Sequence, residues 1–343
     1  MIQKLLRSSW LYIILVALLG VLFLRGMALR ATYPKEAHQA APAKAEPLEL
    51  WPKQLDAQTF HRAFQEDPVA VMLLSFLSTL MAGIALCGVG VTMWNVGPGR
   101  HKRRAAWHRV TPWSFSDLGR ITALTIAAAS LMPVGRAVWM ARTLDAPPDL
   151  HVWMTSSMLL LDAFVILVTL AFAAGKRSAF GLAIRRPLLA IQDALREYLA
   201  VFPWLFALLF GVVQVVRWMG WTPPPEPIHE LVFGESRPHV LAMTVLLACV
   251  VGPVAEELFF RGVLYGALRH RLSRGWAVLA SGAAFALLHT NPVGFLPIMA
   301  LGSLLAYLYE RTGTLLAPLT IHILHNTLLM SFALIVRRLL AYA

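Results

Sequence analysis

The chain has 343 residues, of which 58% are hydrophobic and 14% are charged, and its mean hydropathy is +0.64. A soluble domain of this length needs more charge to cover its surface, so the composition excludes a water-soluble globular protein and predicts a lipid bilayer as its surroundings. The net charge of +12 would suit a nucleic-acid binder. The basic residues, however, gather in short segments between long apolar runs, which is typical of membrane proteins and excludes nucleic acid as the partner.

Apolar runs that could be membrane spans follow one another along the chain. A helix needs about twenty residues to cross roughly 30 Å of hydrocarbon. Candidate spans cover residues 10–24, 69–94, 118–141, 152–174, 199–219, 239–255, 275–290, 294–309 and 314–336. The sequence therefore predicts an all-α, polytopic transmembrane bundle of eight or nine helices, with a water-filled cavity among the last four.

The N-terminal part has a character of its own. The run at 10–24 follows Lys4 and Arg7 and has the outline of a signal peptide. No small-residue cleavage pattern follows it directly, which favours an uncleaved first helix. Residues 30–68 are rich in Ala, Pro, Lys and Glu, which is typical of an exposed linker.

Charge alternates between the segments that connect the spans. Segments 96–116 and 176–198 each carry five Lys or Arg residues and 256–274 carries four, whereas 142–151 and 220–238 carry one each. Because basic loops stay in the cytoplasm, this pattern predicts a cytoplasmic N-terminus in a multi-pass protein of the plasma (inner) membrane.

The C-terminal pair Arg337-Arg338 departs from this pattern, because it falls on the outer side if all nine spans are real. Two explanations stay open at this point. One of the short spans is re-entrant, or the first helix is absent from the mature protein.

Ionisable residues inside apolar runs are the informative ones, since each costs roughly 2.5–3.5 kcal/mol at mid-membrane on insertion scales. Glu256, Glu257 and Arg261 follow Gly252-Pro253 at the end of an apolar run. Glu257 and Arg261 are four residues apart on one helical face and can pair, whereas Glu256 points about 100° away and is left available. An interfacial helix start with acids at its N-terminus is the alternative interpretation.

Two histidine patterns lie in the runs that follow. His289 ends the run that contains Phe285, and it is a candidate ligand or base, or a hydrogen-bonded interfacial histidine. His322 and Asn326 are four residues apart, so both project from one face of an apolar helix and need polar partners on neighbouring helices. A structural hydrogen-bonded pair would fit the same pattern. His325 lies off this face.

Asp162 is a single carboxylate within a long apolar run. An ionisable residue in such a place is a functional-site hypothesis by default, although here we favour a structural role. Arg136 and Arg217 are its candidate partners.

These residues form three motifs in order: EExxxR (Glu256, Glu257, Arg261), FxxxH (Phe285, His289) and HxxxN (His322, Asn326). Three such motifs within membrane segments resemble the CPBP family, which includes the type II CAAX prenyl endopeptidases and bacteriocin-processing or immunity-associated membrane proteins. The resemblance covers roughly residues 245–335. It implies an intramembrane endopeptidase that hydrolyses peptide bonds of membrane-associated substrates, prenylated CAAX-type peptides among them.

The resemblance also implies a role for each motif residue. Glu256 would be the base that activates water, and His289 would help to hold and polarise that water. His322 and Asn326 would supply the oxyanion hole, which stabilises charge on the scissile carbonyl. Supporting roles fall to Glu257, Arg261 and Phe285. General-base work suits a carboxylate in a low-dielectric setting, where it binds a proton more strongly than in water.

A metal is left open by the sequence. Glu256, His289 and His322 could together hold a divalent ion such as zinc with an open position for water, although the motifs do not require one. The chain contains no HExxH, GxGD or GxSG motif, which disfavours the zinc, aspartyl and rhomboid types of intramembrane protease.

Two non-proteolytic functions stay open. The first is a membrane scaffold or immunity-type protein, which would not need the motif residues. The second is a proton-coupled transporter, in which Asp162, Glu256 and His289 would relay protons, although the paired halves of many carriers are not visible.

The favoured hypothesis divides the chain into three parts. They are an N-terminal helix and linker (1–68), transmembrane helices of no recognised family (69–238) and a CPBP-like catalytic core (239–343).

Overall fold

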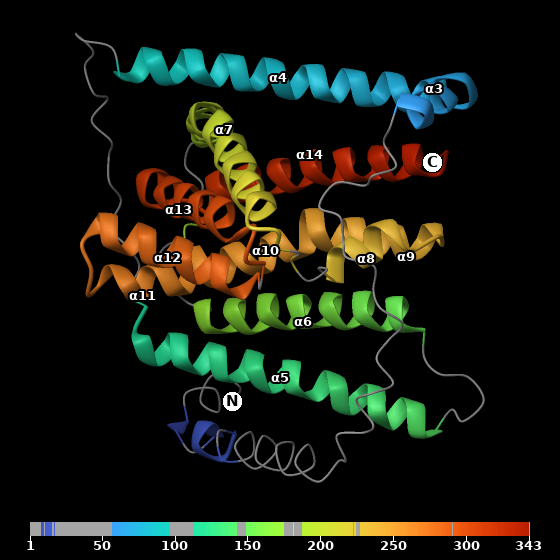
Figure 1. Ribbon diagram of the computed structural model, residues 1–343. Coiled ribbons are helices and arrows are strands. Elements are labelled where there is room, and N and C mark those ends of the chain that lie inside the picture. The colour runs from blue at the N-terminus through green and yellow to red at the C-terminus, as the bar shows by residue number, and fades with distance from the viewer. Residues whose placement is uncertain are drawn as a thin grey trace.

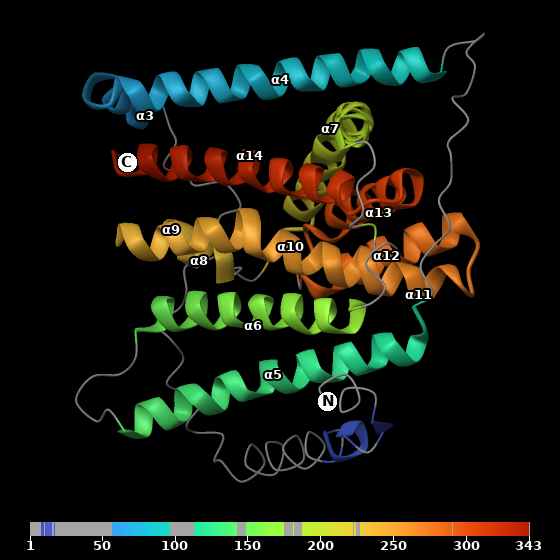
Figure 2. The same ribbon diagram turned by 180° about the vertical axis from the view of Figure 1, so that it is seen from behind.

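The computed structural model describes residues 8–9, 11–15, 17, 57–96, 113–142, 149–174, 181, 187–221, 223, 227–289 and 291–342. Within these ranges every regular element is helical, and most of the long helices lie roughly alongside one another, while the helix Pro187–Trp218 runs across them (Figures 1 and 2). The elements are α3 (Ala57–Glu66), α4 (Pro68–Val96), α5 (Phe115–Arg142), α6 (Leu150–Ala173), α7 (Pro187–Trp218), α8 (Pro227–Phe233), α9 (Pro238–Leu246), η3 (Leu247–Val251), α10 (Gly252–Glu257), η4 (Leu258–Tyr265), α11 (Gly266–Arg269), α12 (Arg274–Leu288), α13 (Phe295–Thr312) and α14 (Leu316–Leu340).

These helices confirm the all-α, polytopic fold expected from the sequence. Every expected span from residue 69 onward coincides with a helix, while the run at 10–24 and most of the linker at 30–68 lie outside the described residues. Six helices of the described chain are long and apolar enough to cross a membrane: Pro68–Asn95, Phe115–Trp139, Leu150–Ala173, Pro187–Trp218, Pro238–Arg269 and Leu316–Leu340.

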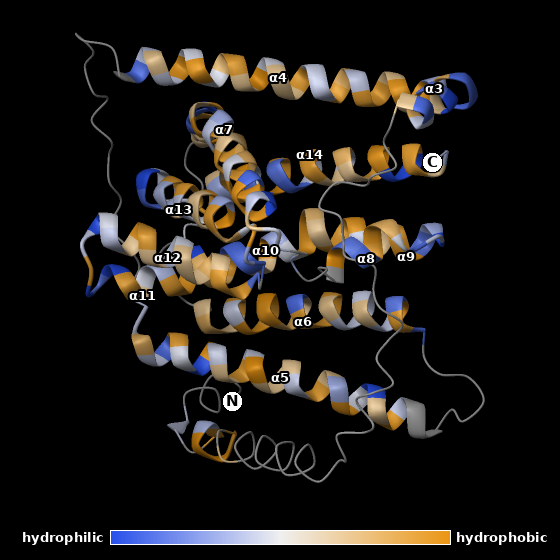
Figure 3. Cartoon of the chain, in the orientation of Figure 1, coloured by the Kyte–Doolittle hydropathy of each residue, from blue (hydrophilic) through white to orange (hydrophobic). Residues whose placement is uncertain are grey.

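Large apolar side chains are exposed on the outside of the bundle, and Figure 3 shows that apolar residues run along the lengths of the helices. Phe76 and Leu86 of α4 are 68% and 75% exposed, and Leu160 of α6 is 69% exposed. An exposed apolar surface of this kind is stable against hydrocarbon and not against water. The chain is therefore an integral, multi-pass membrane protein.

The helix that contains the EExxxR motif runs without a break from Pro238 to Arg269. The expectation that 256–274 is a connecting loop is therefore wrong for the first half of this segment, which is helical. Pro253 does not end the helix, because it lies at the start of α10, where the missing N–H is tolerated. The preceding turn widens into the π-helical stretch η3, in which the Gly252 N–H donates to the Leu247 carbonyl.

Helices α12 and α13 form a short hairpin that enters the bundle from one end. The 15 residues of α12 extend about 22 Å, less than the roughly 30 Å of the hydrocarbon layer. In Figures 1 and 2 both helices occupy only one half of the bundle. Gly282 and Gly302 allow their close contact, since a methyl group on Gly282 would lie 2.7 Å from the backbone of Ser303. His289, which caps the inner end of α12, consequently lies within the bundle and not at its outer end.

The two arginines that departed from the charge pattern both have partners at the end of the bundle opposite the α11–α12 turn (Figure 1). Arg338 forms an ion pair with Asp67, which precedes α4. Arg337 donates to the backbone carbonyl of Glu235, which precedes α9. Their placement at this end is therefore compatible with basic segments gathered at the other end, because a partner satisfies each guanidinium group.

Candidate active site

The centre of the site is a buried group of three side chains. Oε1 of Glu257 lies 2.9 Å from Nη1 of Arg261 and 2.8 Å from Nδ1 of His322. The first contact confirms the pairing expected from the i, i+4 spacing. The second joins α10 to α14 and fixes the orientation of the imidazole ring. All three side chains are at most 2% exposed, so this group lies away from lipid and water.

Arg261 is held on its other sides by α12 and α13. Its Nη2 donates to the Gly302 carbonyl at 3.1 Å, and its guanidinium lies 4.5 Å from the centre of the Phe285 ring. Cations are attracted to the faces of aromatic rings, so this contact partly compensates the buried charge. Phe285 also lies edge-on to His322, with ring centres 5.6 Å apart. The supporting residues of the first two motifs therefore pack against one another.

Glu256 differs from its neighbour because it is accessible. Its side chain is 32% exposed, against 2% for Glu257. Oε2 of Glu256 lies 3.4 Å from Nε2 of His322, so the imidazole ring lies between the two carboxylates. The structure thus places an available carboxylate beside a histidine whose other nitrogen is already held.

His289 reaches this group through Phe285. Its ring centre lies 4.5 Å from that of Phe285, and its Nδ1 lies 2.8 Å from the Phe285 carbonyl, to which it donates. With Nδ1 engaged, Nε2 is the ring nitrogen available for a further hydrogen bond. The ring is half-buried where α12 ends.

Asn326 binds the helix backbone beside the site. Its Nδ2 donates to the Ala248 carbonyl at 2.8 Å. This carbonyl has lost both of its usual partners, because the Gly252 N–H bonds to Leu247 and Pro253 has no N–H. One of the two amide hydrogens of Asn326 therefore satisfies the π-helical turn, and the other is available for a further hydrogen bond.

The remaining sequence candidates lie around this group. His325 points away from it and contacts Tyr198 Oη at 2.9 Å, as its position off the helix face predicted. Asp162 of α6 lies beside Gly252, and Gly252 belongs to the same helix as Glu256. Neither Arg136 nor Arg217 pairs with Asp162, so the proposed arginine partners are wrong.

The three proposed metal ligands were Glu256, His289 and His322. In the part of the chain that the structure describes, no group of three His, Cys, Asp or Glu side chains is arranged so that it could hold a metal ion.

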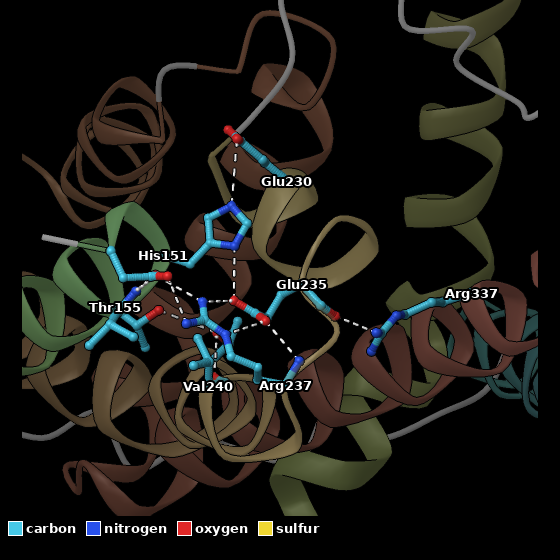
Figure 4. Close-up of polar contacts among 10 residues, drawn as sticks. His151, Thr155, Glu230, Glu235, Arg237, Val240 and Arg337 are labelled. Atoms are coloured by element: carbon cyan, nitrogen blue, oxygen red, sulfur yellow. Dashed lines mark hydrogen bonds and ion pairs between the residues drawn. The ribbon is translucent and has the colours of Figure 1, made fainter. Parts of the chain in front are cut away.

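A second polar cluster, which the sequence did not predict, lies where α6 and α9 begin and α14 ends (Figure 4). Arg237 bonds to both Glu235 and Asp149, and His151 Nδ1 lies 2.9 Å from Oε2 of Glu235. Hydrogen bonds from Arg237 lower the pKa of the Glu235 carboxyl and lower that of Asp149 to about 2. The residues lie in loops and helix ends, where the spacing of charges gives no signal of contact. We call this group the Glu235 cluster.

A third cluster surrounds Glu310, and the sequence did not predict this cluster either. Its carboxylate accepts from Tyr265 Oη at 2.9 Å and from the Nε atoms of Arg269 and Arg274 at 3.2 and 3.1 Å. These contacts hold the ends of α11, α12 and α13 together. The hairpin that supplies Phe285 and His289 is thereby fixed at its outer end.

Comparisons with known proteins agree with the motifs. Residues 238–328 match the family model described as "Type II CAAX prenyl endopeptidase Rce1-like". Two proteins of Bacillus subtilis (strain 168) are similar to part of the chain. "Putative membrane peptidase YdiL" is 32% identical over 85 residues, 25% of this chain and 35% of the relative. "Uncharacterized protein YpbD" is 32% identical over 100 residues, 28% of this chain and 46% of the relative.

The chain thus spans less than half the length of either relative. No solved structure matched it. The matched residues contain all three motifs, from Glu256 to Asn326. The resemblance to type II CAAX prenyl endopeptidases is therefore confirmed for residues 238–328, and a membrane peptidase is the class of protein that it supports.

Proposed function

We propose that this protein is an intramembrane endopeptidase in which Glu256 activates water for hydrolysis of a peptide bond. The observation that supports this most directly is the contrast between two adjacent carboxylates. Glu257 is buried and engaged by Arg261 and His322, whereas Glu256 is partly exposed beside the same histidine. A general base has to be reachable by water, and Glu256 meets this condition.

In the proposed reaction Glu256 accepts a proton from water while the water oxygen attacks the scissile carbonyl carbon. The resulting tetrahedral intermediate carries its negative charge on the former carbonyl oxygen. Nε2 of His322, when protonated, and the remaining amide hydrogen of Asn326 are the proposed donors to that oxygen. The C–N bond then breaks, and Glu256 returns the proton to the leaving amine.

The supporting residues keep the proposed donors in place. Glu257 holds Nδ1 of His322, so that Nε2 is directed toward Glu256. His289 donates through Nδ1 to its own helix, so that Nε2, when it also carries a proton, can donate to the oxygen of the attacking water and polarise it. Preorganised groups of this kind stabilise charge in the transition state without needing to reorient.

The substrate class follows from the surroundings of the site. Glu256 and His322 lie in helices that are long and apolar enough to cross the membrane, so the scissile bond has to reach membrane depth. A peptide with a lipid or apolar anchor can do so. Prenylated CAAX-type peptides and unmodified membrane peptides are the two kinds of substrate to test.

The decisive experiment is cleavage of a panel of both kinds of peptide by purified protein in lipid. We expect Glu256→Gln, which keeps the shape but loses the base, to lower kcat by about 10²- to 10⁴-fold. Glu230→Gln is the matched control, since Glu230 is 56% exposed and its Oε1 lies 3.6 Å from Nε2 of His151 in the Glu235 cluster. Its activity should equal that of the wild type.

Each outcome of this experiment separates two hypotheses. Cleavage by Glu256→Gln at the wild-type rate would contradict the glutamate mechanism. Loss of wild-type cleavage in a chelator, restored by zinc, would add a metal to it. Failure of the wild type to cleave any peptide of the panel would favour a scaffold or a proton-coupled transporter, which a proton-flux assay in vesicles distinguishes.

A further inference from the structure

Asp162 is the one acid of the α6 membrane span, and it belongs to none of the three motifs. It is half-buried among apolar residues, two positions from the exposed Leu160. A carboxylate at membrane depth is costly and is retained where it contributes to function. Its surroundings therefore indicate what it does.

The Asp162 carboxylate lies against Gly252. A methyl group on Gly252 would be 3.6 Å from Oδ2 of Asp162, so the carboxylate lies directly against this face of α10. Glu256 follows four residues later in the same α-helix, and residues four apart lie on one helical face about 5–6 Å from each other. Asp162 and Glu256 thus face the same space between α6 and α10.

No cation compensates Asp162 in the described part of the chain. Gly135, next to Arg136, packs against Trp153, which places that arginine roughly 14 Å away along α6. Arg261 is engaged by Glu257. Glu256, which faces the same space, adds a like charge and not a counter-charge.

Two carboxyl groups that face each other without a cation are stabilised by a shared proton or by a hydrogen-bond donor between them. They do not bond to each other, and both are partly accessible, whereas Glu257 is not. Water is the small molecule that donates two hydrogen bonds at once, and polar sites with several acceptors retain ordered water.

We propose that Asp162 is a further residue of the reaction and that it holds the attacking water together with Glu256. This inference rests on the proposed function. Two carboxylate acceptors fix both hydrogens of the water and leave an oxygen lone pair free for the scissile carbonyl. Asp162 itself neither gains nor loses a bond during hydrolysis.

Steady-state kinetics on a peptide cleaved by the wild type test the role. Misplacement of the water should lower kcat of Asp162→Ala by about tenfold to a hundredfold while KM changes less than about twofold. Asp162→Glu, which can still reach the water, should recover part of kcat. Asp149→Asn, at the N-cap of the helix that contains Asp162, is the control and should leave both constants unchanged. Unchanged kcat in Asp162→Ala, with Glu256→Gln inactive, would overturn this inference alone.

A second measurement does not require cleavage. A structure of the wild-type protein in lipid, at a resolution that shows ordered water, should contain a water within about 3.2 Å of both carboxylates. The water should be missing from Asp162→Ala. Carboxylates without a shared water would overturn the inference, and so would a metal ion about 2.0–2.2 Å from them. A shared water in a protein that cleaves nothing would support the binding site and count against the proposed function.

Discussion

At the scale of single residues, the buried pair of Glu257 and Arg261 explains how a histidine can be fixed inside a membrane protein. A buried pair is rarely a source of net stability, because desolvation of both charges offsets their attraction. Here the pair has a second use, since Glu257 also accepts from Nδ1 of His322. Its position in the bundle therefore supports a role in orienting the site more than a role in stability.

Asn326 leads to a prediction in which structure and chemistry can be separated. Asn326→Ala leaves the Ala248 carbonyl without a partner, which should lower the free energy of unfolding by about 1–3 kcal/mol. It should also lower kcat if the amide helps to form the oxyanion hole. Thermal unfolding and kcat of the purified variant measure the two effects.

A second substitution distinguishes the two effects. Pro253→Ala supplies the N–H that the π-helical turn lacks, so the Ala248 carbonyl regains a backbone donor. The double variant Pro253→Ala/Asn326→Ala should therefore unfold nearer to the wild-type temperature while its kcat stays low. Recovery of kcat together with stability would show that Asn326 acts only on the helix.

The sequence predicted the contacts that lie within one helix and missed those between helices. The Glu257–Arg261 pair follows from i, i+4 spacing, and so does the shared face of His322 and Asn326. The partner of His322 did not follow, because Glu257 comes from a helix 65 residues earlier. The acceptor of Asn326 depends on a π-helical turn, which no periodic pattern of apolar residues encodes.

At the scale of elements, the junction between η3 and α10 positions Glu256 against α6. Gly252 is required there, because a methyl group would lie 2.9 Å from the Leu247 carbonyl. We expect Gly252→Ala to lower the free energy of unfolding by about 1–3 kcal/mol through overpacking, and to lower kcat as α10 shifts. Unfolding and cleavage assays measure both.

Gly211→Ala in α7 is the matched control, since nothing lies within 4 Å of a methyl group there. Alanine favours a helix over glycine by roughly 1 kcal/mol, so this variant should be at least as stable as the wild type. Equal behaviour of the two variants would contradict a special role for the junction.

Element lengths explain which expectations the structure corrected. The sequence located the spans well because long apolar runs are an unambiguous signal. It ended the sixth span at residue 255, since Glu256 and Glu257 look like the start of a loop until their partners on α14 are known. The α12–α13 hairpin could be suspected only from its short, Gly- and Pro-interrupted runs.

At the scale of the whole molecule, the Glu235 cluster and the Asp67–Arg338 pair join α4, α6, α9 and α14 at one end of the bundle. The pKa of Glu235 and that of Asp67 are lowered by their arginine partners, and that of Asp149 is lowered to about 2. A carboxyl with a lowered pKa stabilises the folded state above the pKa of the unfolded chain, about 4, and this contribution is lost as pH falls toward 2.

The unfolding temperature should therefore fall between about pH 5 and pH 2 in the wild type. Arg237→Gln removes the partner of Glu235 and Asp149, and it should unfold at lower temperature at neutral pH with a weaker dependence on acid. Arg217→Gln, at an exposed end of α7, is the control. An acid dependence that is the same in Arg237→Gln as in the wild type would show that the cluster does not stabilise the bundle.

Orientation in the membrane is the last property of the whole molecule that charge predicts. Basic residues surround the α11–α12 turn, among them Arg271 and Arg274, and basic segments remain in the cytoplasm. We therefore expect the α11–α12 turn to face the cytoplasm and α3 to face the outside. In a background without Cys87 and Cys249, an impermeant maleimide should label Gln65→Cys on intact cells and Ser273→Cys only after lysis, since both positions are exposed. Labelling in the reverse order would mean that the arginines at the C-terminal end, and not the basic turns, determine the orientation.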